Sequence, residues 1–348
     1  SRSAVDFRSD AKAVGLKYTE RYAFEKLWKG LSVQVGSTEL DKLRGLRSVG
    51  ALYPVLSVPA PETTSVSNPD LATAITMTGA DIAQASGWTG QGVKVAVMDT
   101  GVDYDNPALG GDGVTRSDSA MFPNSRVVAG YDLVGDAFNA SGSGAALVPN
   151  PDPRPDDCNG HGSHVAGIVG ANGTVAGGMI KGVAPGVTFG AYRVFGCTGS
   201  TTADIMVAAM ERALADGMDI LNMSIGSAFQ TWPQYPTAQA SDALVDAGMV
   251  VVASIGNSGG NFNQNLSAGA PGVGNKVIGV ASYDNSHVSA LTFDTPGRSG
   301  IPYLPIANVP DPPTSGTVNQ SIVHVGQGCN ADTYVGNPSG KVALIRRG

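Results

Sequence analysis

Residues 93–107 read VKVAVMDTGVDYDNP, in which an almost continuously apolar run ends at Asp99 and Gly101 then permits a sharp change of direction. Four later runs share this character, at 189–195, 218–225, 249–256 and 276–282. They alternate with helical patterns over 161–171, 200–217 and 237–249. Continuously apolar strands separated by helices predict a doubly wound, mainly parallel α/β sheet that is covered on both faces.

The strand ends mark where we expect a site. Ligands of doubly wound sheets bind beyond the carboxyl ends of the strands. In this sequence those ends carry Asp99, Ser224 and Asn257. Asp99 and Asn257 also have a plainer interpretation, because an Asp or Asn after a strand often only caps a turn.

Composition changes divide the rest of the chain. Residues 1–58 predict a small α+β unit: a helix around Tyr22 to Trp28, a strand at 31–36, a helix at 37–46 capped by Ser37, and a strand at 50–58. Residues 59–74, rich in Pro, Ser and Thr, predict a linker before the α/β domain of 75–297. Residues 298–348 predict the start of a β-rich module, with strand-like runs at 321–326 and 341–348.

Charge and hydropathy exclude several classes of partner. The net charge is −7 and the only basic cluster is Arg346 with Arg347, so the basic surface of a nucleic-acid binder is missing. No apolar run approaches the roughly 20 residues that span a bilayer. We therefore expect neither a nucleic-acid partner nor a membrane partner.

The segment DDCNGHGSHVAGIVG, residues 156–170, places His161 and His164 at the start of a predicted helix. They are three residues apart with no Glu between them and no third ligand in evidence, which argues against zinc. Gly160 and Gly162 would let a substrate approach His161, so we expect His161 to face a cleft and His164 to point into the structure. A structural histidine is the alternative for either residue taken alone.

Four stretches, VAVMDTGVD, NGHGSHVAGI, NMSIG and ASIGNSG, occur in that order within roughly residues 75–297. Together they resemble the subtilisin-like serine proteases, the subtilase family. The resemblance implies a serine endopeptidase that hydrolyses protein or peptide substrates: Asp99 orients His161, His161 is the general base, and Asn257 stabilises the oxyanion. It also implies a substrate-binding groove formed by Gly199, Ser200, Ser224, Ile225, Gly226, Ser254, Ile255 and Gly256.

The resemblance implies no required cofactor. Calcium stays open as a structural ion, since Asp103, Asp105, Asp132 and Asp136 offer oxygen ligands. Their spacing matches no defined calcium loop.

The nucleophile of the family, in a Gly-Thr-Ser-Met-Ala motif, is missing from this sequence, and Ser163, Ser224 and Ser258 lack that context. Either the chain is the N-terminal portion of a longer protease, or it is an inactive relative that binds peptides or regulates. The final stretch, CNADTYVGNPSGKVALIRRG at 329–348, resembles the opening of a protease-associated domain, which some subtilases carry before the serine. This favours the first alternative.

Residues 20–58, including GLSVQV and VGALYPV, resemble the later part of the inhibitory prodomain of these proteases. The resemblance implies an intramolecular inhibitor that is processed somewhere in 58–75, and a secreted protein. Of the three cysteines, Cys158 and Cys197 would either pair in a disulfide or remain buried thiols. Cys329 would then have its partner further along the chain.

Overall fold

The computed structural model describes residues 4–61, 71–114, 122–173, 180–259, 266–282, 285, 291–303, 320–327 and 334–345. The chain forms two compact units, Ser1–Ser289 and Ala290–Gly348. Within the described part, no helix is both long enough and apolar enough to cross a bilayer.

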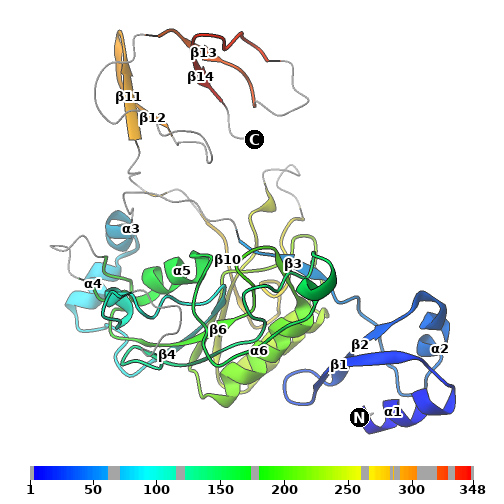
Figure 1. Ribbon diagram of the computed structural model, residues 1–348. Coiled ribbons are helices and arrows are strands. Elements are labelled where there is room, and N and C mark those ends of the chain that lie inside the picture. Colours follow the sequence, from blue (N-terminus) through cyan, green and yellow to red (C-terminus); the bar gives the residue numbers. More distant parts are fainter. Residues whose placement is uncertain are drawn as a thin grey trace. The chain divides into compact units, whose positions relative to one another are not determined.

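A six-stranded sheet forms the centre of the first unit, with the strands in the spatial order β10, β9, β8, β4, β6, β5. Figure 1 labels β4, β6 and β10 of this sheet. Every neighbouring pair is parallel, which confirms the predicted α/β fold. The strands are β4 Lys94–Asp99, β5 Val127–Asp132, β6 Thr188–Arg193, β8 Ile220–Met223, β9 Val250–Ser254 and β10 Ile278–Val280. Only β5 was not predicted.

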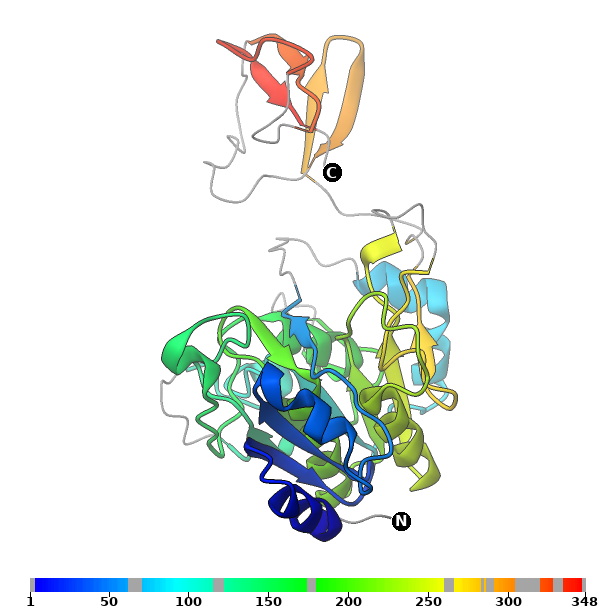
Figure 2. The same ribbon diagram turned by 90° about the vertical axis from the view of Figure 1, so that its right-hand side faces the viewer.

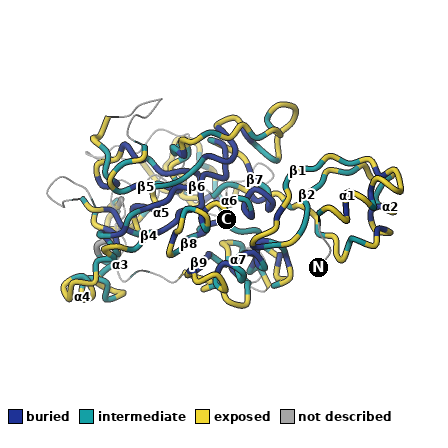
Figure 3. The backbone as a smooth tube through the Cα atoms, turned by 90° about the horizontal axis from the view of Figure 1, so that it is seen from below, coloured by how far each residue is buried: buried dark blue, intermediate teal, exposed yellow. Residues whose placement is uncertain are grey.

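Helices cover both faces of this sheet, as its apolar strands predict. Along β4, Val95 and Val97 pack in one cluster with Val165 of α5, His161–Gly170. The alternate residues Ala96 and Met98 pack in a second cluster with α6, Ala203–Ala215, and α7, Pro236–Asp246. Figure 3 shows the buried residues concentrated along these central elements.

The N-terminal region contains α1 Ala4–Ala13, β1 Tyr18–Phe24, β2 Gly30–Val35, η1 Ser37–Glu39 and α2 Leu40–Arg44. The strand at 31–36 and the helix at 37–46 are confirmed. The helix predicted around Tyr22 to Trp28 is wrong, because these residues form β1, antiparallel to β2, and the turn that follows it. Tyr22 and Phe24 are two residues apart, so their rings stack on one face of a strand.

Two further N-terminal details differ from the predictions. Ser37 does not cap the helix, because it is already the first residue of the helical turn. The capping position is taken by Gly36, which is extended and has no side chain to donate or accept a hydrogen bond. The strand predicted at 50–58 is limited to its end, β3 Ser57–Pro59, which pairs antiparallel with β7 Ser200–Thr202 rather than within the small unit. A partner this distant in sequence leaves no local signal.

The remaining elements of the first unit are α3 Leu71–Thr78, α4 Ala80–Ala85, η2 Pro107–Leu109 and η3 Gly144–Leu147. Helix α3 begins inside the predicted linker, of which residues 62–70 lie outside the described part. In the second unit, β11 Leu291–Thr295 and β12 Arg298–Tyr303 form an antiparallel hairpin. Strands β13 Ile322–His324 and β14 Val342–Leu344 are parallel and lie in the two predicted β-like runs. Cys329 is outside the described residues.

Candidate active site

Asp99 and His161 meet at the carboxyl end of β4. The Nδ1 atom of His161 lies 2.8 Å from Oδ1 of Asp99, although the residues are 62 positions apart. The Asp99 side chain is fully buried and that of His161 is 18% exposed. Oδ1 of Asp99 also accepts a hydrogen bond from the backbone N–H of Thr100, at 2.8 Å. The carboxylate thus holds one ring nitrogen and leaves Nε2 for other chemistry.

The electrostatics of the pair favour a basic imidazole. Burial alone would lower the pKa of His161, but the hydrogen bond and charge of Asp99, with the charge of Asp157, raise it above its usual value. Burial raises the pKa of Asp99, against the opposing effects of His161 and the Thr100 N–H. A buried carboxylate that stabilises an imidazolium is the electrostatic requirement of a histidine general base.

Asp157 organises the loop that presents His161, a role that the sequence analysis missed. Its Oδ1 accepts hydrogen bonds from the Asn159 and Gly160 N–H groups and the Thr100 hydroxyl, at 2.9, 2.9 and 3.0 Å. Its Oδ2 accepts from the N–H and hydroxyl of Ser163. Burial would raise the pKa of Asp157, but these hydrogen bonds hold it below its ordinary value. The signal in the sequence, an Asp two residues before Asn159, reads only as a turn.

The expectation that His164 points into the structure is wrong, because His164 is exposed. The face of α5 that packs on the sheet carries Gly162, Val165 and Ala166, and helical geometry puts residue 164 on the opposite side. Ser163 accepts a hydrogen bond from the Asp103 N–H at 2.8 Å and donates its hydroxyl proton to Asp157. Its hydroxyl is therefore structural.

Asn257 is exposed and follows β9, after Gly256 at a φ of 106°. Because β9, β8 and β4 are adjacent and parallel, their carboxyl ends lie at one edge of the sheet. Asp99, Ser224 and Asn257 share that edge. Of the predicted catalytic residues, the structure brings Asp99 and His161 into contact and places Asn257 beyond a neighbouring strand.

An extended segment lies along the predicted substrate edge. Pro59 of β3 is opposite Ser200 of β7, and the Ala60 N–H donates to the Gly199 carbonyl at 2.8 Å. Figure 2 views the backbone from the side on which the N-terminal region lies. This antiparallel pairing is the geometry by which a peptide adds a strand to an exposed edge.

The other predicted binding residues follow β8 and β9. Ile225 is 3% exposed and packs in the core, so its side chain is unavailable to a substrate. Gly226 lies against the Ala270 carbonyl, and the Ser224 hydroxyl accepts a hydrogen bond from the Asn222 amide. Ser254 pairs with β10, and both backbone polar groups of Ile255 are hydrogen-bonded, to Val280 and Gly269.

The aspartates considered for calcium do not form one ligand group in the described part of the chain. Asp132 and Asp136 lie 3.2 and 2.8 Å from the guanidinium of Arg193, which is 2% exposed. Asp103 accepts a hydrogen bond from the Asp105 N–H. The single cluster there with metal-ligand spacing, Asp136 with Cys158 and Cys197, contains a disulfide, because the two sulfurs are bonded.

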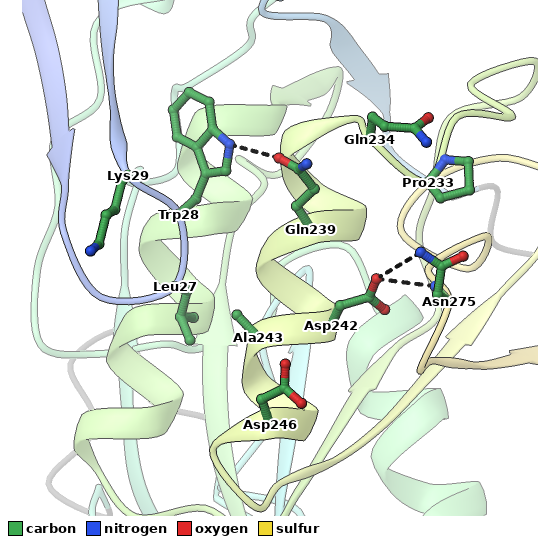
Figure 4. Close-up of a pocket in the computed structure, with 10 residues that line it drawn as sticks. All are labelled: Leu27, Trp28, Lys29, Pro233, Gln234, Gln239, Asp242, Ala243, Asp246 and Asn275. Atoms are coloured by element: carbon green, nitrogen blue, oxygen red, sulfur yellow. Dashed lines mark hydrogen bonds between the residues drawn. The ribbon is translucent and has the colours of Figure 1, made fainter. Parts of the chain in front are cut away.

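A pocket of about 340 Å³ lies elsewhere, between the 27–29 turn and α7 (Figure 4). Trp28 donates its indole N–H to Gln239 at 3.0 Å beside it, and Asp242 accepts from Asn275. Neither Asp99 nor His161 lines this pocket, so it belongs to the contact of the N-terminal region with α7 rather than to the paired carboxylate and imidazole.

Sequence comparison identifies the family to which this α/β fold with its buried Asp–His pair belongs. Residues 90–338 match the model of the subtilase family, peptidase S8, and the chain belongs to this family. It is 32% identical over 334 residues to the minor extracellular protease Vpr of Bacillus subtilis, covering 93% of this chain and 38% of that protein. It is 34% identical over 221 residues to subtilisin DY of Bacillus licheniformis, covering 63% of this chain and 66% of that protein. The chain thus spans less than two thirds of either relative.

Proposed function

We propose that the protein is a serine endopeptidase in which Asp99 orients His161, His161 removes the proton of a serine nucleophile, and Asn257 donates to the oxyanion. The observation that carries the proposal is the 2.8 Å contact between a fully buried carboxylate and a partly exposed imidazole at the carboxyl edge of the sheet. Membership of the subtilase family supports it.

The serine is proposed to follow Gly348 in the full-length protein. The printed sequence lacks a Gly-Thr-Ser-Met-Ala motif, and the chain matches only 38% of the length of Vpr. Residues 298–348 would open a protease-associated domain inserted before that serine. The 348 residues alone should therefore not hydrolyse peptides, because removal of one member of a triad costs orders of magnitude in rate.

The N-terminal region is proposed to act as the intramolecular inhibitor. Support comes from β3, which occupies the edge of β7 where a substrate would pair. The N-terminal region also docks on α6 through polar contacts. Arg21 and Ser32 donate to Asp204 at 2.8 and 2.6 Å, and the Lys26 N–H donates to Glu211 at 3.1 Å. Cleavage within 58–75, followed by dissociation of the N-terminal region, would expose the edge of β7.

Secretion is part of the proposal. A disulfide between Cys158 and Cys197 suits an oxidising compartment, and Vpr is named as an extracellular protease. The chemistry itself requires no cofactor.

Hydrolysis of a fluorogenic peptide by the full-length protein tests the proposal. His161→Ala should lower kcat/KM by at least about 10³-fold, because the nucleophile loses its base. His164→Ala is the matched control, since it removes an exposed imidazole from the next turn of the same helix and should leave the rate unchanged. Equal activity of the two variants would refute the assignment. Peptide binding without hydrolysis, together with a gene that encodes no later Gly-Thr-Ser, would instead indicate an inactive binding protein.

A further inference from the structure

The disulfide between Cys158 and Cys197 joins the histidine loop to the substrate edge strand, whose relative position the proposed reaction depends on. Cys158 precedes Gly160 and His161 by two and three residues, and Cys197 precedes Gly199 and Ser200 by the same intervals. One covalent bond therefore connects the loop that presents the imidazole to the edge strand on which an extended peptide lies.

A long hydrogen bond also joins these two segments, since the Asn159 amide donates to the Cys197 carbonyl at 3.3 Å, near the long limit for such a bond. Within the histidine loop, the Asn159 side-chain oxygen accepts from the His161 N–H, also at 3.3 Å. Gly160 and Gly199 adopt φ values of 101° and 97°, so each segment has a glycine in the left-handed region beside its cysteine. A Cβ atom at Gly160 would meet nothing within 4 Å, whereas one at Gly199 would overlap the Asn139 side chain at 2.2 Å. The histidine loop is therefore open beside its cysteine, while the edge strand packs against the 139–141 loop.

The far side of β7 is held independently. The Ser200 carbonyl accepts from the Ala140 N–H at 2.9 Å, and the Ser141 and Ser200 hydroxyls lie 2.6 Å apart. These bonds attach the strand to the 139–141 loop but not to the histidine loop. Loss of the disulfide would leave β7 folded while its position relative to His161 relaxes.

The bond is open to solvent and chemically asymmetric. Cys158 is exposed and Cys197 is partly exposed. The buried Arg193 guanidinium donates to Sγ of Cys158 at 3.0 Å and lies 3.8 Å from Sγ of Cys197. A cation beside a sulfur stabilises its thiolate, so Cys158 is the better leaving group when an external thiolate attacks Cys197.

We propose that Cys158 and Cys197 are positioning residues, whose disulfide fixes the substrate edge strand against the catalytic histidine loop, and that an extracellular dithiol can open this clamp. The inference rests on the proposed function. In the opening step, one dithiol supplies two electrons and two protons: the Sγ–Sγ bond breaks, two thiols form, and the reductant leaves as its disulfide.

Hydrogen exchange on the 348-residue chain tests the clamp without relying on peptidase activity of the protein. A Cys329→Ser background restricts the chemistry to this bond, and dithiothreitol followed by alkylation traps the opened form, which mass spectrometry verifies. Exchange at residues 159–163 and 199–202 should rise together by about tenfold or more, while β4 and β6 remain protected. The double variant Cys158→Ser with Cys197→Ser should reproduce this pattern and show no further response to dithiothreitol. Unchanged exchange in either segment after verified opening would overturn the proposal.

Full-length enzyme supplies the functional test. Opening the bond should lower kcat/KM by about tenfold for a peptide long enough to pair with β7, because a misplacement of the order of 1 Å is costly. A single-residue ester, which does not reach β7, should lose less than about threefold. Equal losses for both substrates would refute positioning through the edge strand. Altered exchange in a protein that cleaves no peptide would instead reject the proposed function and keep the clamp.

Discussion

Gly162→Ala should damage the site through packing alone. Gly162 lies in the first turn of α5, and its N–H donates to the Thr100 hydroxyl at 2.9 Å. A Cβ atom at this position would lie 2.0 Å from the Gly101 carbonyl oxygen and 3.1 Å from Cβ of Asp99. Relief of the first contact requires the helix start to move away from the end of β4 by about 1 Å, since overpacked groups must separate to van der Waals distance.

The magnitude follows from two opposing contributions. Overpacking of a dense interior costs about 1–3 kcal/mol. Replacement of Gly by Ala within a helix recovers up to about 1 kcal/mol. We expect a net loss of about 1–2 kcal/mol in the free energy of unfolding of the first unit. In the full-length enzyme, the same displacement of His161 from Asp99 should reduce kcat/KM by about 100-fold.

Gly167→Ala is the matched control in the same helix. Gly167 is also buried, but a Cβ there would meet nothing closer than Cδ1 of Ile180 at 3.5 Å, an ordinary contact. This variant should gain up to about 1 kcal/mol. Urea unfolding followed by tryptophan fluorescence measures the first unit, because Trp28, Trp88 and Trp232 all lie within it. If Gly162→Ala is as stable as Gly167→Ala, the close approach of α5 to residue 101 is incorrect.

Three further predictions concern charges. Burial raises the pKa of Asp156 from 3.8 to about 6, so this carboxyl stabilises the fold while protonated, and that contribution is lost as the pH rises from about 4 through 6. The urea midpoint of Asp156→Asn should therefore rise relative to that of the parent protein between pH 4.5 and pH 7. A difference in midpoint that stays constant over this range would contradict the shift. Asp99→Asn should lower kcat/KM of the full-length enzyme by about 10⁴-fold at unchanged fold, as circular dichroism would verify, whereas a loss below tenfold would exclude the orienting role. Asp204→Asn removes the carboxylate that binds Arg21 and Ser32 and should weaken the docking of the N-terminal region by about 1–3 kcal/mol. Faster hydrogen exchange of the Lys26 and Leu27 N–H groups in the same interface measures this loss, and unaltered exchange would mean that the Asp204 hydrogen bonds do not stabilise the docking.

The sheet could be predicted because its signal is local: the strand that ends at Asp99 is apolar on both faces, which a short window of sequence shows. The pairing of Asp99 with His161 was predicted from the resemblance of the ordered motifs to the subtilase family, because either residue taken alone also fits a structural role. Strand β5 was missed because Ala129 and Gly130 interrupt its apolar run. Strand β1 was mistaken for a helix because a few aromatic residues at short intervals fit both the helical period and the alternation of a strand.

The contacts that position the site were not predictable from the same signals. Asp157 binds groups from residues 100, 159, 160 and 163, which a linear reading does not bring together. The pairing of β3 with β7 links residues more than 140 positions apart in three-residue strands that have no apolar run. Interactions of this kind become visible only when the fold has fixed which loops are neighbours.

The two members of the pair depend on the fold in different ways. Asp99 is placed by the register of β4 with β6 and β8, and its side chain is fully buried, so the sheet itself fixes the carboxylate. His161 stands at the N-terminus of a helix outside the sheet, and its position depends on the Asp157 hydrogen bonds and on the close contact at Gly162. Mild perturbations of these loops should therefore separate the imidazole from the carboxylate before the sheet loses any stability, and activity should fail at lower urea concentration than tryptophan fluorescence reports unfolding.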